Sequence, residues 1–195
     1  MRFLLTMIMF GAFFSVSGKE TDLNESIPVY TDLVTAIQKP DSVIQLVLKK
    51  KKYTDFPEEI WMFKNLQFLD LSKNKLDSIP VKIKELKNLK VLKLSRNNIS
   101  SIPVELYTLK NLEVLVLSDN EMAYIAPDIG NLTKLKKLDL WRTNIALFPE
   151  EMSRLDSLEV VDLRGISLNR KQQADVLDII LKAKVYFSPP CNCNF

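Results

Sequence analysis

The chain has 195 residues, with 27 Lys plus Arg against 24 Asp plus Glu, 30 leucines, four glycines, two cysteines and no histidine. Without histidine there is no Ser-His-Asp or Cys-His catalytic arrangement and no imidazole metal site, and four isolated glycines exclude a Gly-rich phosphate loop. We therefore expect no enzyme, with no catalytic residues, no metal and no cofactor. The net charge of +3 also argues against nucleic acid as a partner, because such binders are strongly basic.

Residues 1–18 have the layout of a secretory signal peptide. Arg2 precedes an apolar run over residues 3–14, and small residues follow it. This run is too short to span a bilayer as a mature helix, which takes about 18 or more apolar residues. We expect cleavage after Ser17 or Gly18 and export to the periplasm, the cell surface or the medium, with a retained N-terminal anchor as the alternative. The mature chain is predicted to have no transmembrane segment.

Residues 19–42 are expected to form an N-terminal cap. Thr31 is a candidate helix N-cap, and Pro40 ends the helix. The apolar side chains between them give this short helix a face that covers the first strand of the core: Leu33, Val34, Ala36 and Ile37.

Residues 43–168 repeat with a constant spacing of 23 residues. Within a unit, apolar residues two positions apart, such as Leu69 and Leu71, indicate a short strand with one buried side. One strand cannot bury that side alone, so the units are expected to stack with parallel strands and the return segments opposite. Where each strand turns away, an amide ladder is predicted to satisfy backbone groups; it comprises Asn74, Asn97 and Asn120. Five full units begin at Val43, Leu66, Leu89, Leu112 and Leu135, and a partial sixth begins at Leu158.

This pattern resembles the leucine-rich repeat proteins of the 23-residue bacterial type. The stretch over residues 29–40, which leads directly into the first repeat, resembles more narrowly the secreted leucine-rich repeat proteins of spirochaetes. The resemblance implies an α/β solenoid with a parallel concave sheet, a short N-terminal helical cap and a C-terminal cap of helix and strand. Lys51 and Ile166 stand where the first and sixth units should have Asn, at the ends of the stack where atypical units are expected.

Residues 169–195 are expected to form the C-terminal cap and a tail. Asn169 with Gln172 resembles a capping box, and the segment over residues 185–187 is predicted to be extended. The tail holds the two cysteines, Cys191 and Cys193. An intermolecular disulfide, a strained internal one and free thiols all remain open, so a homo-oligomer linked through either cysteine is one alternative. The apolar face of the predicted helix consists of Ala174, Leu177, Ile180 and Leu181.

Outward-facing strand positions carry the candidate ligand site, because the leucines are committed to the core. In the stack these positions form columns, in which several apolar side chains make a contiguous patch with a charged rim. A patch of this kind with Trp and Arg is typical of a protein-binding hot spot, with Trp141 as the principal anchor. The alternative is that the valines serve strand propensity and that a neighbour such as Lys137 covers Trp141. The predicted site is Phe68, Val91, Lys93, Arg96, Val114, Val116, Asp139, Trp141 and Arg142.

A basic corner follows the first strand of the repeats and comprises Lys49, Lys50, Lys51 and Lys52. It is a candidate contact for acidic sugars, anionic lipid or an acidic partner. The alternative is that these lysines are solvated and protect one end of the sheet from pairing with another chain.

Together these features predict an exported module that binds a protein or peptide ligand on its concave sheet. The resemblance implies a bacterium that meets a host, so an adhesin-like role is the sharper hypothesis. The alternative is a structural or housekeeping protein of the periplasm or envelope that associates with itself.

Overall fold

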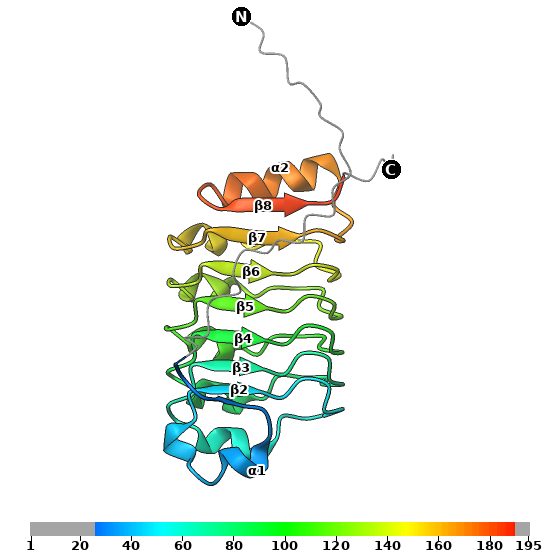
Figure 1. Ribbon diagram of the computed structural model, residues 1–195. Coiled ribbons are helices and arrows are strands. Elements are labelled where there is room, and N and C mark those ends of the chain that lie inside the picture. The colour runs from blue at the N-terminus through cyan, green and yellow to red at the C-terminus, as the bar shows by residue number, and fades with distance from the viewer. Residues whose placement is uncertain (1–25, 190–195) are drawn as a thin grey trace, which may run out of the picture.

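A computed structural model describes residues 26–189. The predicted signal peptide and both cysteines therefore lie outside the described residues. Eight parallel strands form one sheet in which every strand is hydrogen-bonded to the next in chain order, as Figure 1 shows. The strands are β1 (Val29–Tyr30), β2 (Gln45–Val47), β3 (Phe68–Asp70), β4 (Val91–Lys93), β5 (Val114–Val116), β6 (Lys137–Asp139), β7 (Val160–Leu163) and β8 (Lys184–Phe187).

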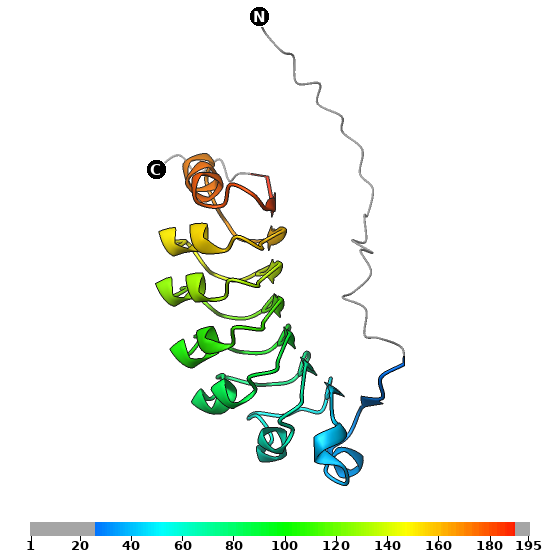
Figure 2. The same cartoon turned by 90° about the vertical axis from the view of Figure 1, so that its left-hand side faces the viewer.

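The helical segments are short and lie on the side opposite the strands (Figure 2). Two are α-helices at the ends of the stack, α1 (Leu33–Ala36) and α2 (Arg170–Ile179). The others are 3₁₀ turns in the return segments, which lie on the convex side of the curved solenoid, with the sheet on its concave side. These turns are η1 (Pro40–Ser42), η2 (Glu58–Met62), η3 (Val81–Glu85), η4 (Val104–Thr108), η5 (Pro127–Asn131) and η6 (Glu150–Arg154).

The 23-residue spacing is the register of the sheet. Leu46 pairs with Leu69, and the same offset joins each strand to the next up to β7. The leucines of these columns have no exposed surface or almost none, because they point into the space between the sheet and the return segments. The predicted leucine-rich repeat solenoid is confirmed. At the last pairing the offset changes, since Val161 pairs with Val185, so β8 is a capping strand and not a seventh repeat.

The amide ladder is confirmed and lies just beyond the strand ends. The Asn97 amide donates to the carbonyls of Leu71 at 3.2 Å and Leu94 at 2.8 Å, and its oxygen accepts the Leu76 N–H at 3.1 Å. Asn120 repeats this pattern one unit later. Each amide therefore ties its own unit to the preceding one. In the first unit, where Lys51 replaces Asn, the Lys51 N–H donates to the Asn74 side chain at 2.8 Å.

Between the strand and the ladder, one residue in each unit has left-handed backbone geometry. Its φ lies between 54° and 78°, and its N–H continues the inter-strand hydrogen bonding, as in Lys73 to the Ser95 carbonyl at 2.8 Å. Five of the six have a side chain, although this geometry favours glycine. The column is Lys50, Lys73, Arg96, Asp119, Arg142 and Gly165.

The two caps agree with the predictions in outline and correct them in detail. The N-cap of α1 is Asp32 and not Thr31, because the Asp32 carboxylate accepts the Thr35 N–H at 2.8 Å. The capping box of α2 is confirmed, with Asn169 and Gln172 bonding reciprocally at 2.9 Å. The predicted apolar face of α2 is wrong in part: Val176 and Ile180 are buried, whereas Ala174, Leu177 and Leu181 are exposed. Within residues 26–189, no helix has the length and apolar character needed to span a bilayer.

Candidate functional site

The concave side of the sheet holds a groove of about 470 Å³ that runs across five strands, from β2 to β6. We call it the concave groove. Its lining is mainly polar: five lysines, two aspartates, three serines and two valines. They are Lys49, Lys50, Asp70, Ser72, Lys73, Lys93, Ser95, Val114, Val116, Ser118, Lys137 and Asp139.

The predicted apolar patch exists as a small cluster on the groove side of the sheet, separate from the leucine core. Phe68, Val91 and Val114 form its centre, and Val47 and Val116 pack against it. The three central side chains are less than 9% exposed. Strands about 4.8 Å apart bring their side chains into mutual contact, so this column largely covers itself. The cluster is therefore the floor of the site, and its exposed apolar area is smaller than the sequence predicts.

Lys93 covers part of this floor. Its ammonium lies 5.3 Å from the centre of the Phe68 ring, within range of a cation–π contact, and the side chain is only 9% exposed. The aliphatic stem of a lysine covers apolar surface while the charged end stays near solvent. Lys93 thus places a positive charge directly above the apolar floor.

Trp141 does not belong to the apolar cluster, which corrects the prediction of one continuous patch that includes it. The side chain is half-buried at the exit of β6. The guanidinium of Arg142, and not Lys137, covers the indole, at 5.1 Å from the ring centre. Trp141 and Arg142 form a separate aromatic and basic contact beyond the end of the concave groove.

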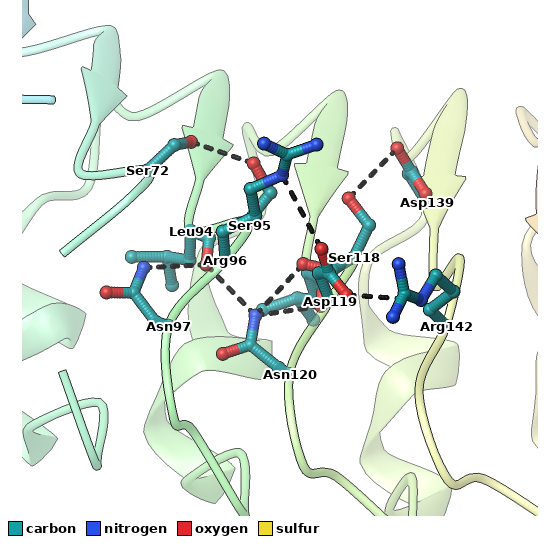
Figure 3. Close-up of polar contacts among 11 residues, drawn as sticks. Ser72, Leu94, Ser95, Arg96, Asn97, Ser118, Asp119, Asn120, Asp139 and Arg142 are labelled. Carbon is teal, nitrogen blue, oxygen red and sulfur yellow. Dashed lines mark hydrogen bonds and ion pairs between the residues drawn. The ribbon is translucent and has the colours of Figure 1, made fainter. Parts of the chain in front are cut away.

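The predicted rim residues Arg96 and Arg142 are held by one carboxylate. The two oxygens of Asp119 lie 3.5 Å from Arg96 Nε and 3.4 Å from Arg142 Nε, as Figure 3 shows. All three residues belong to the left-handed column, so their side chains come from equivalent turns of successive units. This triad fixes the two guanidinium groups along the strand exits.

Both aspartates of the groove already have polar partners within the protein. Asp70 is fully buried, and its Oδ1 accepts the Ser72 N–H at 2.9 Å. Its Oδ2 lies 2.9 Å from Lys49 Nζ, an ion pair without the alignment of a directed hydrogen bond. Asp139 accepts the Trp141 N–H at 3.1 Å and the Ser118 hydroxyl at 3.4 Å. Burial raises the pKa of Asp139 above its ordinary value.

The predicted basic corner divides in two. Lys49 and Lys50 line the concave groove, whereas Lys51 and Lys52 do not. Lys50 and Lys52 both have left-handed backbone geometry, with φ of 58° and 64°, so the chain turns sharply here. Half of the predicted corner, Lys49 and Lys50, therefore belongs to the concave groove, and Lys51 and Lys52 lie outside its lining.

Several lining residues were not among the predicted site residues, although they occupy the same columns. Lys73 and Lys137 bring two further positive charges, and the serine hydroxyls of three successive units follow one another along the groove. Ser95 donates to Ser72 at 3.0 Å (Figure 3). The column spacing places them on the outward side of the sheet, and Asp70 belongs to the predicted charged rim; the additional lining residues are Ser72, Lys73, Ser95, Ser118 and Lys137. Residues 26–189 contain no cluster of three His, Cys, Asp or Glu residues able to hold a metal ion.

Comparison with known proteins finds a matching family model and similar solved structures. The family model for a leucine-rich repeat region matches residues 44–138, and no curated protein matches the chain. A leucine-rich repeat protein of Leptospira interrogans is similar at 26% identity and a TM-score of 0.67, over 84% of this chain and 49% of the other.

Two internalins of Listeria monocytogenes share the fold. InlF is 19% identical with a TM-score of 0.65, over 82% of this chain and 46% of its own. Internalin C2 is 24% identical with a TM-score of 0.63, over 82% and 67%. The chain thus spans about half the length of the Leptospira protein and of InlF.

Proposed function

Because the chain is a leucine-rich repeat protein similar to bacterial members of that family, we propose that it is a protein-interaction module whose ligand is a protein or peptide bound in the concave groove. The observation that carries the proposal is the lining of the groove. Outward side chains from five strands converge there on one open surface, while the leucines of the same strands are buried. The sheet holds these side chains at fixed spacing, so a ligand meets a preformed surface.

The dimensions of the groove suit an extended polypeptide. Five strands at about 4.8 Å separation span about 19 Å between the outer two, which matches about six residues of extended chain at about 3.3 Å per residue. An apolar floor within a polar and charged rim is also the composition of protein interfaces. Serine hydroxyls along the floor can bond the amides of such a segment.

We place this binding outside the cytoplasm, as the pattern of residues 1–18 predicts. A host protein as ligand, which would make the chain adhesin-like, is the sharper form of the proposal. A structural role in the envelope with self-association is the second candidate. Protease added to intact cells separates them: degradation supports surface exposure, and protection supports the periplasmic alternative.

The groove itself is tested with a substitution that fills it. Ser95→Trp places an indole in the middle of the floor, where the native side chain is half-buried. The control is Ser101→Trp, at an exposed position of the return segment. A partner captured by the native chain and then purified should lose at least about tenfold in affinity for Ser95→Trp, equivalent to about 1.4 kcal/mol, and none for the control. Equal affinity for both variants would exclude the concave groove as the binding site.

The predicted anchor Trp141 is tested in the same assay. It lies outside the groove lining, so Trp141→Ala should weaken binding only if the ligand extends past β6 onto the Trp141–Arg142 contact. A loss for Ser95→Trp without a loss for Trp141→Ala would confine the ligand to the groove.

A further inference from the structure

We infer that the concave groove selects an acidic, extended peptide segment. This inference rests on the proposed function and adds the chemistry of the ligand. Its basis is the charge of the lining, in which five lysines face two aspartates. Four of the five units along the groove, those of β2, β3, β4 and β6, contribute at least one lysine each, so lysines lie at both ends of the groove.

The groove carboxylates neutralise only part of this charge, since two aspartates stand against five lysines and one of them pairs with Lys49. Asp70 is fully buried and is occupied by the Ser72 N–H and by Lys49. Asp139 is occupied by the Trp141 N–H and by Ser118. Of the remaining lysines, Lys50, Lys73 and Lys137 form no ion pair with any carboxylate within residues 26–189; this group we call the open lysines.

The outer surface of the solenoid provides a contrast. There, lysines pair with glutamates of a neighbouring repeat: Lys64 with Glu85 at 2.9 Å and Lys136 with Glu113 at 2.8 Å. Lys82 likewise pairs with Glu58 at 2.6 Å. The repeat spacing thus allows a lysine to find a carboxylate one unit away. In the groove, the equivalent positions of the neighbouring units beside the open lysines carry Lys, Arg or Val and no carboxylate.

The spacing of the positive charges fits carboxylates on alternate residues of an extended ligand. Side chains on one face of such a segment repeat about every 6.6 Å, and lysine stems are flexible enough to meet them from strands about 4.8 Å apart. Lys50 and Lys73 come from adjacent strands at one end of the groove, and Lys137 comes from β6 at the other. The residues between the carboxylates can then contact Lys93 and the serines.

The floor favours a peptide over other anions. Val114 and Val116 line the groove beside the charges, so a ligand with apolar as well as acidic side chains gains more than a sulfated sugar, which has no aliphatic or aromatic side chains to cover them. A flat bilayer cannot enter the concave side of a curved sheet.

The experiment uses the full chain and a phage-displayed library of random 12-residue peptides. Enrichment of Asp and Glu at alternate positions around apolar residues is expected. The best peptide, made synthetically, should bind at least about tenfold more weakly to Lys73→Gln/Lys137→Gln and should lose affinity as salt rises. The matched control is Lys84→Gln/Lys87→Gln, which removes the same charge from the outer surface. A selected consensus that is neutral or basic would overturn the inference.

Two further arms separate this inference from the proposed function on which it rests. If neutral peptides are selected and Ser95→Trp abolishes their binding, the groove is a peptide site and only its acidic preference is wrong. If no selected peptide is sensitive to Ser95→Trp, both proposals are wrong. A heparin octasaccharide is measured in parallel; heparin binding that depends on Lys73 and Lys137, together with no acidic consensus among the peptides, would assign the groove to an anionic sugar.

Discussion

The amide ladder shares its acceptors between neighbouring units, so its members contribute unequally to stability. The carbonyl of Leu71 accepts from both Asn74 and Asn97, and that of Leu94 accepts from both Asn97 and Asn120. The carbonyl of Leu117 accepts from Asn120 at 2.9 Å, but the next unit has Thr143, which donates only to Leu140. The two end members, Asn74 and Asn120, therefore each have one acceptor without a second side-chain donor, whereas both acceptors of Asn97 are shared.

We predict that Asn97→Ala lowers the free energy of unfolding by about 2 kcal/mol. The buried Leu76 N–H loses its acceptor, whereas the Leu71 and Leu94 carbonyls each keep one side-chain donor. Asn120→Ala should cost about 1 kcal/mol more, since both the Ile99 N–H and the Leu117 carbonyl lose their side-chain hydrogen-bond partner. Urea unfolding of both variants measures the difference. Asn98→Ala is the control, because this adjacent side chain is exposed, and its cost should be negligible. Equal costs at Asn97 and Asn120 would contradict the sharing of acceptors.

Asp139 makes the stability of the fold depend on pH, with a sign opposite to that of most carboxylates in folded proteins. Burial raises its pKa in the folded protein, and the nearby carboxylate of Asp162 acts in the same direction. As the pH falls below the folded pKa, the folded protein takes up a proton while the unfolded chain is still ionised. Protonation of Asp139 therefore increases the stability of the folded protein as the pH falls toward 3.8, the ordinary pKa of an Asp carboxyl. The same stability is lost as the pH rises.

We predict that Asp139→Asn raises the melting temperature at pH 7, where the native carboxylate is charged, and that the gain shrinks as the pH falls toward 3.8. The Asn oxygen can still accept the Trp141 N–H. Melting curves of both proteins at several pH values between 4 and 7 measure the trend. Asp156 is the matched comparison: its exposed carboxylate is bonded by Lys182, which lowers its pKa, so Asp156→Asn should show a slight dependence of the opposite sign. A gain for Asp139→Asn that is independent of pH would refute this account.

At the residue scale, the sequence predicts residues that repeat in every unit and have an evident chemical role. It does not predict features that depend on the backbone geometry. The ladder amides were predictable, because an Asn at a strand exit has an evident role. The left-handed column was not, because only Gly165 signals that geometry, whereas Lys73 and Arg96 give no such sign. The low exposure of Val91 and Val114 was also missed, since an outward position in a strand normally faces solvent and here meets its own copies in the next unit.

At the element scale, α2 shows how a correct boundary can accompany a wrong face. The capping box fixed the first turn, but a helix of this length can present either of two apolar stripes. The structure buries the one through Val176 and Ile180, four residues apart, and leaves Leu177 and Leu181 in solvent. The choice is made by β8, which must pair with β7 and so sets how the helix lies on the last repeat. No local pattern encodes that constraint.

The two faces of α2 give a direct test. Val176→Ala should cost about 2 kcal/mol, because it removes two methyl groups from a nearly inaccessible position. Leu177→Ala removes a larger group one residue away, but its side chain is 48% exposed, and we expect less than about 0.5 kcal/mol. Chemical unfolding of both variants measures the ratio. A larger cost for Leu177→Ala would mean that the helix lies with its other face on the repeats.

At the scale of the whole molecule, the order of the sheet was predictable and the shape of the site was not. A constant 23-residue period admits one register, and the structure has it from β2 to β7. The columns that face the ligand follow from the same period, so Lys93, Val114 and Asp139 were identified. How far the five strands converge into one groove, and which lysines find a carboxylate, depend on curvature and side-chain packing that a linear pattern does not contain.

A solenoid in which each unit contacts only its neighbours should lose structure from its ends. The interior strands have partners on both sides, whereas β1 has two residues and β8 pairs on one side within residues 26–189. The amide ladder spans only the interior units, which further separates the centre from the caps. Local opening free energies should therefore rise from both ends toward β4 and β5.

Hydrogen exchange of backbone amides measures this profile. We predict the strongest protection for β3 to β6, intermediate protection for β7, and the weakest for β1 and β8. Val176→Ala should lower protection in α2 and β8 first, then in β7, and leave β3 unchanged, because the loss is transmitted only through successive interfaces. Asn97→Ala is the opposite control, since it weakens the centre and should lower protection on both sides of it. If Val176→Ala lowers protection equally in all strands, the chain unfolds as one cooperative unit, and the concave groove cannot stay ordered while a cap opens.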